Sequence, residues 1–263
     1  ASQGGAVYVA EDVKDVNNNI SLISQCVAYN NAAGERSVEE NAGGGFYIAG
    51  EATAANTSAF NNEKGGMRIS PEATVTNCTV ARNTGAGIDL TEDDHTQNVQ
   101  NTIIWGNTTL SLQYQPTFRY SAFHEVEDDD SNNNIYVSDK NRDKEYGPFF
   151  DAPSLSTGFD REYNGENTNY PTWSWDILEG TVMVNKGYSN FYNGDAYGNE
   201  DIKGRPRISG DNIDIGAQEY QFLPASRRRY VKQGGTGNGL SWDNASGDLQ
   251  RMIDELADNN PQN

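Results

Sequence analysis

Cysteine and basic residues are scarce in this chain of 263 residues. Its 2 Cys cannot cross-link a chain of this length, and they neither prove nor exclude an oxidising compartment. The 19 Lys and Arg face 38 Asp and Glu, so the formal net charge is −19, which argues against nucleic acid as a partner. No apolar run approaches the roughly 18–20 residues of a membrane span, so we expect none in this segment.

Asparagine and glycine are abundant instead, with 31 Asn and 27 Gly. Acidic chains with such a composition are often disordered. Here, however, 14 Tyr, 9 Phe and 4 Trp supply more aromatic side chains than disordered segments carry. The composition therefore predicts a folded chain.

The first hundred residues contain an internal repeat. Segments that end in Asn align with one another, and their last residues are Asn31, Asn62, Asn83 and Asn107. A second column alternates in polarity, and it reads Val7-Tyr8-Val9, Phe46-Tyr47-Ile48, Met67-Arg68-Ile69 and Ile88-Asp89-Leu90. Each repeat is expected to carry two short strands, with the apolar residues on one face and the middle residues of the second column on the other.

A parallel β-helix is the architecture that fits units of this size. A unit so short and so dense in Gly and Asn has no room for a helical i, i+3, i+4 stripe. Propeller blades need about 40 residues, and the pattern of leucine-rich repeats is missing. We therefore predict an all-β fold with regular β-helix coils over residues 1–107. Each strand is expected to pair with its equivalent one coil away, roughly 4.8 Å distant.

The aligned asparagines have a structural explanation in this fold. Asn31, Asn62, Asn83 and Asn107 are expected to lie above one another, where their amides can pass hydrogen bonds along the stack. Asn also tolerates the left-handed backbone of a sharp corner between strands. We expect a structural ladder, and a row of amides that binds sugar or metal is the functional alternative.

The repeat spacing is lost after residue 107, although strands are expected at 110–114, 118–126 and 135–137. Asp128, Asp130 and Asn132 alternate as the ligands of a calcium loop do. The run lacks the central Gly of such a loop, and Asp139 stands where its last Glu would be. A solvated acidic loop is the other interpretation, so no cofactor is expected unless calcium binds here.

The region from about residue 100 to residue 220 resembles the closing part of a known family. The segments that carry the resemblance are Trp105-Gly106-Asn107, Tyr146–Phe150, Val184–Gly187, Asp201–Arg207 and Ile213–Tyr220. They are similar to the ending of bacterial surface proteins called choice-of-anchor Q, in the pectin-lyase-like superfamily, although Gly147-Pro148 replaces the usual Asp-Pro. The resemblance implies a right-handed parallel β-helix, with irregular coils and a cap over residues 108–221, and an extracellular or cell-surface location.

A solenoid must stop its end coil from pairing with other chains, and charges and aromatic residues near the end of this β-helix could do so. Arg205 and Arg207 are expected to pair with nearby acids over the last coil, namely Asp201, Asp211, Asp214 and Glu219. Trp173 and Trp175 lie one residue apart, on one face of any strand, and are expected to cover the apolar interior. A carbohydrate-binding platform is the alternative for these two residues.

The last part of the sequence reads as a linker, 222–228, and a separate unit, 229–263. Tyr230-Val231-Lys232, a Gly-rich stretch and a helix capped by Ser246 resemble the opening of another such β-helix. The apolar side of that helix would consist of Leu249, Met252, Ile253 and Leu256. We therefore expect the start of a second β-helix unit, and a sequence that belongs to a longer chain.

The strongest local candidate for catalysis is Asp93-Asp94-His95, just after a strand of the repeat. Glycosidases need two carboxylates about 5–10 Å apart. The Gly-His-Gly motif that accompanies the Asp-Asp pair of polygalacturonases is absent, and His95 and His124 are the only histidines. A turn is the alternative interpretation, and we assign no catalytic residue.

These features together favour a non-catalytic segment of a large modular secreted or surface protein. We expect it to act as an adhesin or scaffold that binds a polysaccharide or another surface protein. A polysaccharide lyase or glycoside hydrolase of the pectin-lyase-like fold is the second hypothesis. A structural strut of a surface assembly is the third.

Overall fold

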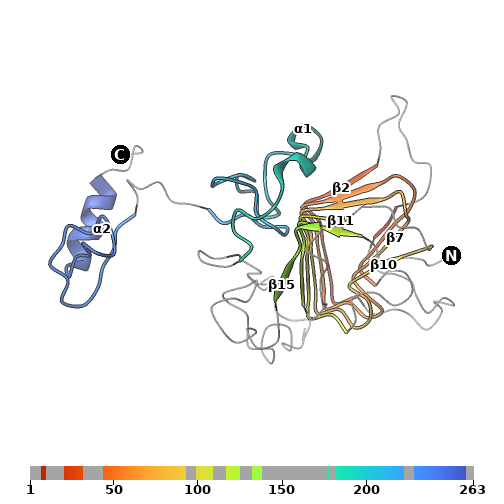
Figure 1. The fold of residues 1–263 in the computed structure, drawn as a ribbon, viewed down its shortest axis with the longest axis horizontal. Helices are drawn as coiled ribbons and strands as arrows, with labels where there is room; N and C mark the ends of the chain where they lie inside the picture. The colour runs from red at the N-terminus through yellow and green to blue at the C-terminus, as the bar shows by residue number, and fades with distance from the viewer. Residues whose placement is uncertain are drawn as a thin grey trace, which may run out of the picture. The chain divides into compact units, whose positions relative to one another are not determined.

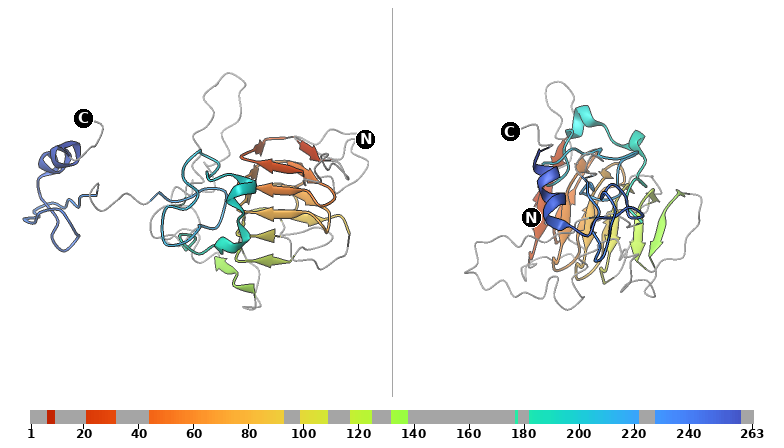
Figure 2. Two further views of the ribbon diagram at one scale, coloured as in Figure 1. Left: turned by 90° about the horizontal axis from the view of Figure 1, so that it is seen from above. Right: turned by 90° about the vertical axis from the view of Figure 1, so that its left-hand side faces the viewer.

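A computed structural model describes residues 7–9, 21–31, 44–92, 99–108, 117–124, 132–137, 177, 182–221 and 228–258 (Figure 1). The chain divides into two units, Ala1–Tyr220 and Gln221–Asn263. The first unit is built from parallel strands of two or three residues that stack coil upon coil, as Figure 2 shows from the side. This is the predicted all-β fold, a parallel β-helix, and its topology is consistent with the right-handed form.

The strands form three sheets, named here in the order in which the chain enters them. The first sheet has the order β1 (Val7–Val9), β4 (Phe46–Ile48), β7 (Met67–Ile69) and β10 (Ile88–Leu90). The second has the order β13 (Phe118–Arg119), β11 (Val99–Gln100), β8 (Thr74–Thr76), β5 (Thr53–Ala55) and β2 (Leu22–Ser24). The third has the order β15 (Ile135–Val137), β14 (Ala122–His124), β12 (Ile103–Trp105), β9 (Thr79–Ala81), β6 (Ser58–Phe60) and β3 (Val27–Tyr29).

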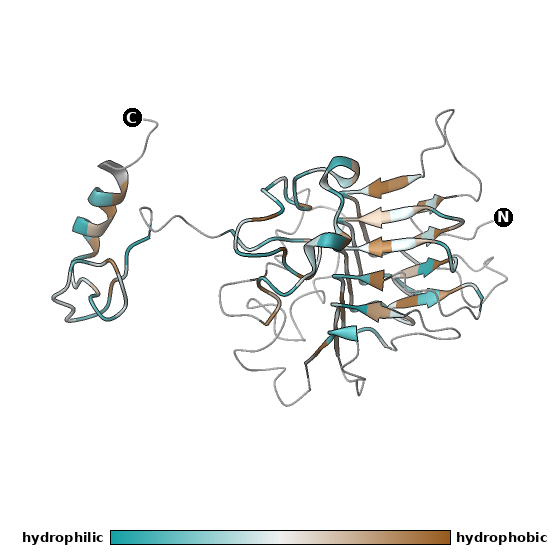
Figure 3. Ribbon diagram, turned by 45° about the horizontal axis from the view of Figure 1, so that its top comes forward, coloured by the Kyte–Doolittle hydropathy of each residue, from teal (hydrophilic) through white to brown (hydrophobic). Residues whose placement is uncertain are grey.

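The predicted register of the repeat is confirmed in the first sheet. Val7 pairs with Phe46, Phe46 with Met67, and Met67 with Ile88. The end residues of these strands point inward and the middle residues point outward, so that Phe46 and Ile48 are fully buried. Figure 3 shows the alternation of apolar and polar residues along the strands.

Each of the first four coils contains three strands, whereas the sequence predicted two. The additional strands form the second sheet, in which only the middle residue of a strand such as Thr53–Ala55 or Thr74–Thr76 points inward. The predicted strand at 118–126 is also two strands, β13 and β14, because Tyr120 between them has a left-handed backbone with φ of 48°. The predicted strand at 110–114 lies outside the described residues.

Sharp corners join the second sheet to the third in every coil. The first corner residue has a positive φ, between 47° and 53°, at Gln25, Asn56, Asn77, Asn101 and Tyr120. Asn adopts this conformation more readily than most residues, which explains its frequency here. The next corner position holds Cys26, Thr57 and Cys78 in successive coils. Both cysteines are free thiols, as the register predicts for residues two coils apart.

A segment of the first unit, residues 182–220, is named here the strap. It contains the 3₁₀ helix η3 (Ser189–Phe191) and the short helix α1 (Gly194–Tyr197), which Asn193 caps by accepting a hydrogen bond from Ala196 N. The strap was predicted to cover the last coil, and this is wrong. It lies along the side of the β-helix (Figures 1 and 2) and bonds to Gln25 in the first coil as well as to Asn101 further along.

The second unit contains a bridge between Val231 and Ser246, a Gly-rich loop and helix α2 (Leu249–Asp258). Asp248 caps α2 by accepting a hydrogen bond from Arg251 N at 3.0 Å, a role that the sequence suggested for Ser246. Met252 is buried within the unit, whereas Leu249 and Ile253 are exposed. The expected strand at 230–232 is reduced to the single bridge.

Candidate functional site

The outer faces of the three sheets differ in what covers them. Over the third sheet a second apolar core forms outside the β-helix, where the strap and Ile177 pack on outward residues. It consists of Phe60, Ala81, Ile103, Trp105, Ala122, Ile177, Met183 and Ile215. Over the second sheet, the backbone oxygen of Phe191 in the strap accepts a hydrogen bond from Thr76 Oγ1. The guanidinium of Arg119 lies 4.7 Å from the centre of the Phe191 ring. The strap therefore occupies outward positions on both sheets.

The first sheet presents a column of four side chains of three kinds on its outer face. Tyr8, Tyr47, Arg68 and Asp89 stand at equivalent positions in successive strands. Tyr8 is 49% exposed, Tyr47 and Arg68 are half-buried, and Asp89 is buried. The rings of Tyr8 and Tyr47 lie 5.1 Å apart between centres at an angle of 35°. We name this row the outer column.

The chemistry of the outer column suits an extended ligand with both apolar and charged groups. Neighbouring strands are about 4.8 Å apart, so four positions span roughly 14 Å. A tyrosine ring offers an apolar face and a hydroxyl, and a guanidinium binds carboxylate or similar anions with paired hydrogen bonds. The sequence placed these four residues on one face but did not single them out as a site. The sequence feature that could have revealed them is that the middle position of each first-sheet strand, which lies between two core residues, changes from tyrosine to arginine and aspartate along the repeat.

The four predicted ladder asparagines are joined by hydrogen bonds between their side chains. Asn31 Nδ2 donates to Asn62 Oδ1 at 2.6 Å, Asn62 Nδ2 to Asn83 Oδ1 at 2.9 Å, and Asn83 Nδ2 to Asn107 Oδ1 at 2.8 Å. Each acceptor oxygen also receives the backbone N–H of the preceding asparagine in the ladder. Because Asn62 and Asn83 are buried, their amides serve the fold and are not available to a ligand.

Glycines lie directly beside this ladder. A methyl group added at Gly66 would lie 2.7 Å from Asn83 Nδ2, and one added at Gly87 would lie 2.8 Å from Asn107 Nδ2. Such distances are too short for a real side chain. The Gly column and the Asn column of the sequence therefore form a single packing unit.

Most other predicted site residues lie outside the described residues. These are Asp93, Asp94 and His95 of the catalytic candidate, Trp173 and Trp175 of the aromatic platform, and Asp128 and Asp130 of the acidic run. Asn132 is described, and its carbonyl oxygen accepts a hydrogen bond from Tyr120 N at 3.0 Å. In the described part of the chain, no cluster of three or more His, Cys, Asp or Glu side chains could hold a metal ion.

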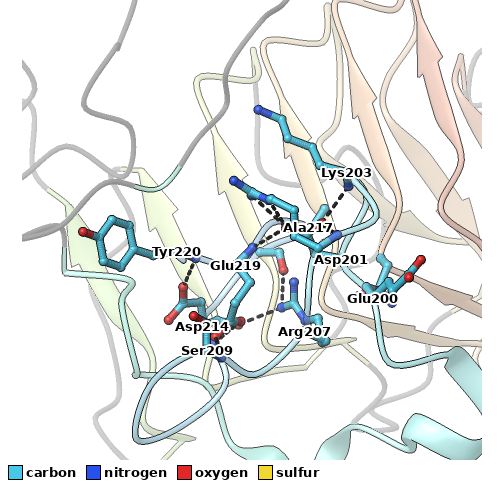
Figure 4. A network of polar contacts seen from close by, with 12 residues as sticks. Glu200, Asp201, Lys203, Arg207, Ser209, Asp214, Ala217, Glu219 and Tyr220 are labelled. Carbon is cyan, nitrogen blue, oxygen red and sulfur yellow. Dashed lines mark hydrogen bonds and ion pairs between the residues drawn. The ribbon is translucent and has the colours of Figure 1, made fainter. Parts of the chain in front are cut away.

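A network of buried charges lies within the strap (Figure 4). The Asp201 carboxylate accepts hydrogen bonds from the backbone of Lys203 and Arg205, and it pairs with the Arg205 guanidinium at 2.7 Å. Asp214 accepts hydrogen bonds from Asn185 N at Oδ1 and from Tyr220 N at Oδ2. The predicted ion pair of Arg205 with an acid is therefore present, although it lies beside the coils and not over the last one.

Arg207 and Glu219 are two further buried members of this network. Arg207 Nη2 donates to the carbonyl oxygens of Asp214 and Gly216, and burial lowers the pKa of its guanidinium. Glu219 accepts hydrogen bonds from Ser209 N and Asp214 N. Burial, reinforced by the charge of Asp214, raises the pKa of Glu219 to about 8, and burial also raises the pKa of Asp214. Because these carboxylates bind backbone amides of the strap, they shape the strap and do not form an open site.

Comparisons with protein-family models, curated proteins and solved structures found no match to this chain. Within the described residues, no helix is both long and apolar enough to span a membrane. The geometry therefore defines the chain by its fold, a parallel β-helix with one mixed outer column. Such a fold fits a scaffold or a binding role in general.

Proposed function

We propose that this protein is a non-catalytic binding scaffold of a secreted or cell-surface bacterial protein, and that it holds an acidic polysaccharide along the outer column. The observation that carries the proposal is the contrast between the faces. The strap occupies outward positions on the second and third sheets, whereas the first sheet presents two neighbouring tyrosines, whose rings are tilted to each other, beside Arg68 and Asp89. Glycan chains are extended and repetitive, which matches a row of sites at a constant spacing.

Each member of the outer column has a distinct role in this proposal. The Tyr8 and Tyr47 rings stack on the apolar face of a sugar ring, and the Arg68 guanidinium pairs with a uronate carboxylate. Asp89, which is buried next to Arg68 in the register, helps to fix the position of that guanidinium. The net charge of −19 opposes polyanions in general, so an acidic polysaccharide is expected to bind through single carboxylates placed at Arg68 and not through a dense row of charges.

The test is a binding assay against immobilised acidic and neutral polysaccharides, with and without calcium. Tyr8→Ala is expected to weaken binding about three- to tenfold, since an aromatic contact contributes roughly 0.5–1.5 kcal/mol. Arg68→Gln is expected to weaken binding more than tenfold for acidic chains, because hydrogen bonds to charged groups contribute roughly 1.5–3 kcal/mol. Neither change is expected to weaken the binding of neutral chains, which is already weak, by the same factor as the binding of acidic chains.

Matched controls come from the second unit, where Trp242→Ala removes an exposed aromatic ring and Arg251→Gln an exposed guanidinium. These variants are expected to bind as the wild type does. Equal losses in the controls and in the column variants would contradict the proposal. Release of shortened products would instead support the polysaccharide lyase or hydrolase. If the polysaccharides are neither retained nor cleaved, the structural strut is the remaining hypothesis.

A further inference from the structure

Three buried polar side-chain atoms near Tyr192 have no hydrogen-bond partner in the part of the chain that the structure describes. They are Arg207 Nε and Nη1 in the strap and Asn56 Oδ1 at a corner of the β-helix. Arg207 is 1% exposed and Asn56 is 0% exposed, so bulk solvent does not reach either side chain. Folded proteins satisfy nearly all buried polar atoms with protein groups or ordered water, because an unsatisfied one costs free energy. These atoms therefore indicate that a small molecule binds here.

Asn56 differs in this respect from Asn77, the equivalent corner residue of the next coil. Asn77 Oδ1 accepts a hydrogen bond from Asn101 Nδ2 at 3.2 Å. The amide nitrogen of Asn56 donates to Tyr192 Oη at 2.6 Å and to Glu200 O at 3.1 Å, but its oxygen accepts no hydrogen bond from the described residues. This corner therefore keeps one buried acceptor beside the strap.

Arg207 supplies two donors beside the same tyrosine. Its Nη2 donates to the backbone oxygens of Asp214 and Gly216, whereas Nε and Nη1 donate to none of the residues that the structure describes. The guanidinium carbon lies 5.8 Å from the centre of the Tyr192 ring, and the hydroxyl of that ring accepts the hydrogen bond from Asn56. One tyrosine therefore lies next to both the unused donors and the unused acceptor.

The molecule that these atoms require is water. The two donors need an acceptor and the acceptor needs a donor, and water supplies both. An anion would satisfy only the guanidinium, which already has the acids Asp201, Asp214 and Glu219 within electrostatic reach. A cation would satisfy only Asn56, and the charge of Arg207 would repel it. Neither kind of ion therefore fits the whole set of atoms.

We propose that internal water bound beside Tyr192 links the strap to the β-helix, accepting hydrogen bonds from Arg207 and donating to Asn56. A water that bridges two polar groups is enthalpically nearly as good as a direct hydrogen bond. The strap is then attached at this corner through solvent as well as through the direct bonds of Asn56 to Tyr192 and Glu200. The site lies at a corner between the second and third sheets, so it holds water whether or not a glycan binds to the first sheet.

The test is nuclear magnetic resonance of the whole chain in water, in which the arginine Nε–H groups are observed directly. Water that stays in the site gives Arg207 Nε–H a cross-peak to the water signal with opposite signs in laboratory-frame and rotating-frame spectra, whereas proton exchange gives the same sign in both. We expect this cross-peak for Arg207. Arg205 is the matched control within the strap, because its Nε–H donates to Asp201 Oδ2 at 2.9 Å, and it is expected to lack the cross-peak. An observed Arg207 Nε–H resonance without the cross-peak would overturn the proposal.

Two further measurements identify the bound molecule. The Arg207 cross-peak is expected to persist in Tyr192→Phe, which removes the hydroxyl proton that could relay the signal, and its loss in this variant would overturn the assignment to water. In a high-resolution crystal structure, water oxygens within about 3.2 Å of Arg207 Nε and Asn56 Oδ1 would support the proposal. An anomalous signal at the same place after chloride is replaced with bromide would show an anion, and it would overturn the proposal.

Discussion

Replacing Asn83 with Ala should destabilise the first unit more than replacing Asn31, although both belong to the ladder. The Asn83 side chain takes part in four hydrogen bonds: its Nδ2 donates to Asn107 Oδ1 and Ala59 O, and its Oδ1 accepts from the Asn62 backbone and side chain. At about 1 kcal/mol each, their loss costs about 4 kcal/mol. The Asn31 side chain makes one such bond in the ladder, so its loss costs about 1 kcal/mol.

Thermal unfolding followed by circular dichroism measures this difference. In a domain of this size 1 kcal/mol corresponds to a shift of about 2–4 °C, so Asn83→Ala is expected to lower Tm by about 8–16 °C and Asn31→Ala by about 2–4 °C. Asn83 has an ordinary negative φ, in contrast to Asn56 and Asn77, so the change does not also alter backbone preference.

The Asn83→Asp variant separates the ladder from simple packing. It retains the size of the side chain and an oxygen for Asn62, but it has no N–H to donate and places a second oxygen near Ala59 O. It is expected to be at least as unstable at pH 7 as Asn83→Ala. Equal Tm shifts for the Asn31 and Asn83 variants, or a nearly neutral Asn83→Asp, would refute the reasoning.

Two further predictions concern the interior of the coils. In the native protein at pH 8, a thiol reagent is expected to modify Cys26, which is partly exposed, and not Cys78, whose buried thiol has a pKa of about 12. Both cysteines should react after denaturation. Labelling of Cys78 in the native protein, detected by mass spectrometry, would contradict this. Gly66→Ala is expected to lower Tm by several degrees because the added methyl group meets Val80 Cγ1 and Asn83 Nδ2. Gly234→Ala, which meets no atom within 4 Å, should leave the melting of the first unit unchanged.

Much of the β-helix could be predicted from the sequence because two sets of aligned residues recur in each repeat, the strand residues of the first sheet and the ladder asparagines. Inward residues such as Phe46 and Ile48 flank an outward residue, which gives the first sheet a clear period of two. The ladder asparagines recur because each amide needs an identical neighbour one coil away. Both signals survive the unequal spacing of the repeats, since insertions leave the stacked positions unchanged.

The second sheet was missed because its strands carry almost no pattern. Only one residue per strand points inward, and it can be as small as Ala54, while the flanking residues in β5 and β8 are Thr or Ala. Register comes instead from the neighbouring corner, where Asn56 and its equivalents have a positive φ. A strand whose position is fixed by a corner needs little hydrophobic alternation of its own.

The position of the strap was missed because its contacts join residues that are far apart in the chain. The hydrogen bonds from Gln25 and Asn101 reach residues 176 and 87 positions away, and no local pattern encodes such a pairing. One signal was nevertheless present. The segment Ile103-Ile104-Trp105 is apolar on both faces, which is typical of a strand that is covered on both sides.

The outward residues of the sheets also indicate which face of this β-helix is left for function. A β-helix needs apolar residues only on its inner face, so each outward residue reports what lies over it. The third sheet carries Phe60, Ile103 and Trp105 outward, and the strap covers them. At the equivalent outward positions the first sheet carries tyrosine, arginine and aspartate, which form no apolar core of their own. This difference between the outward rows of the two sheets is the basis of the binding role that we propose for the outer column.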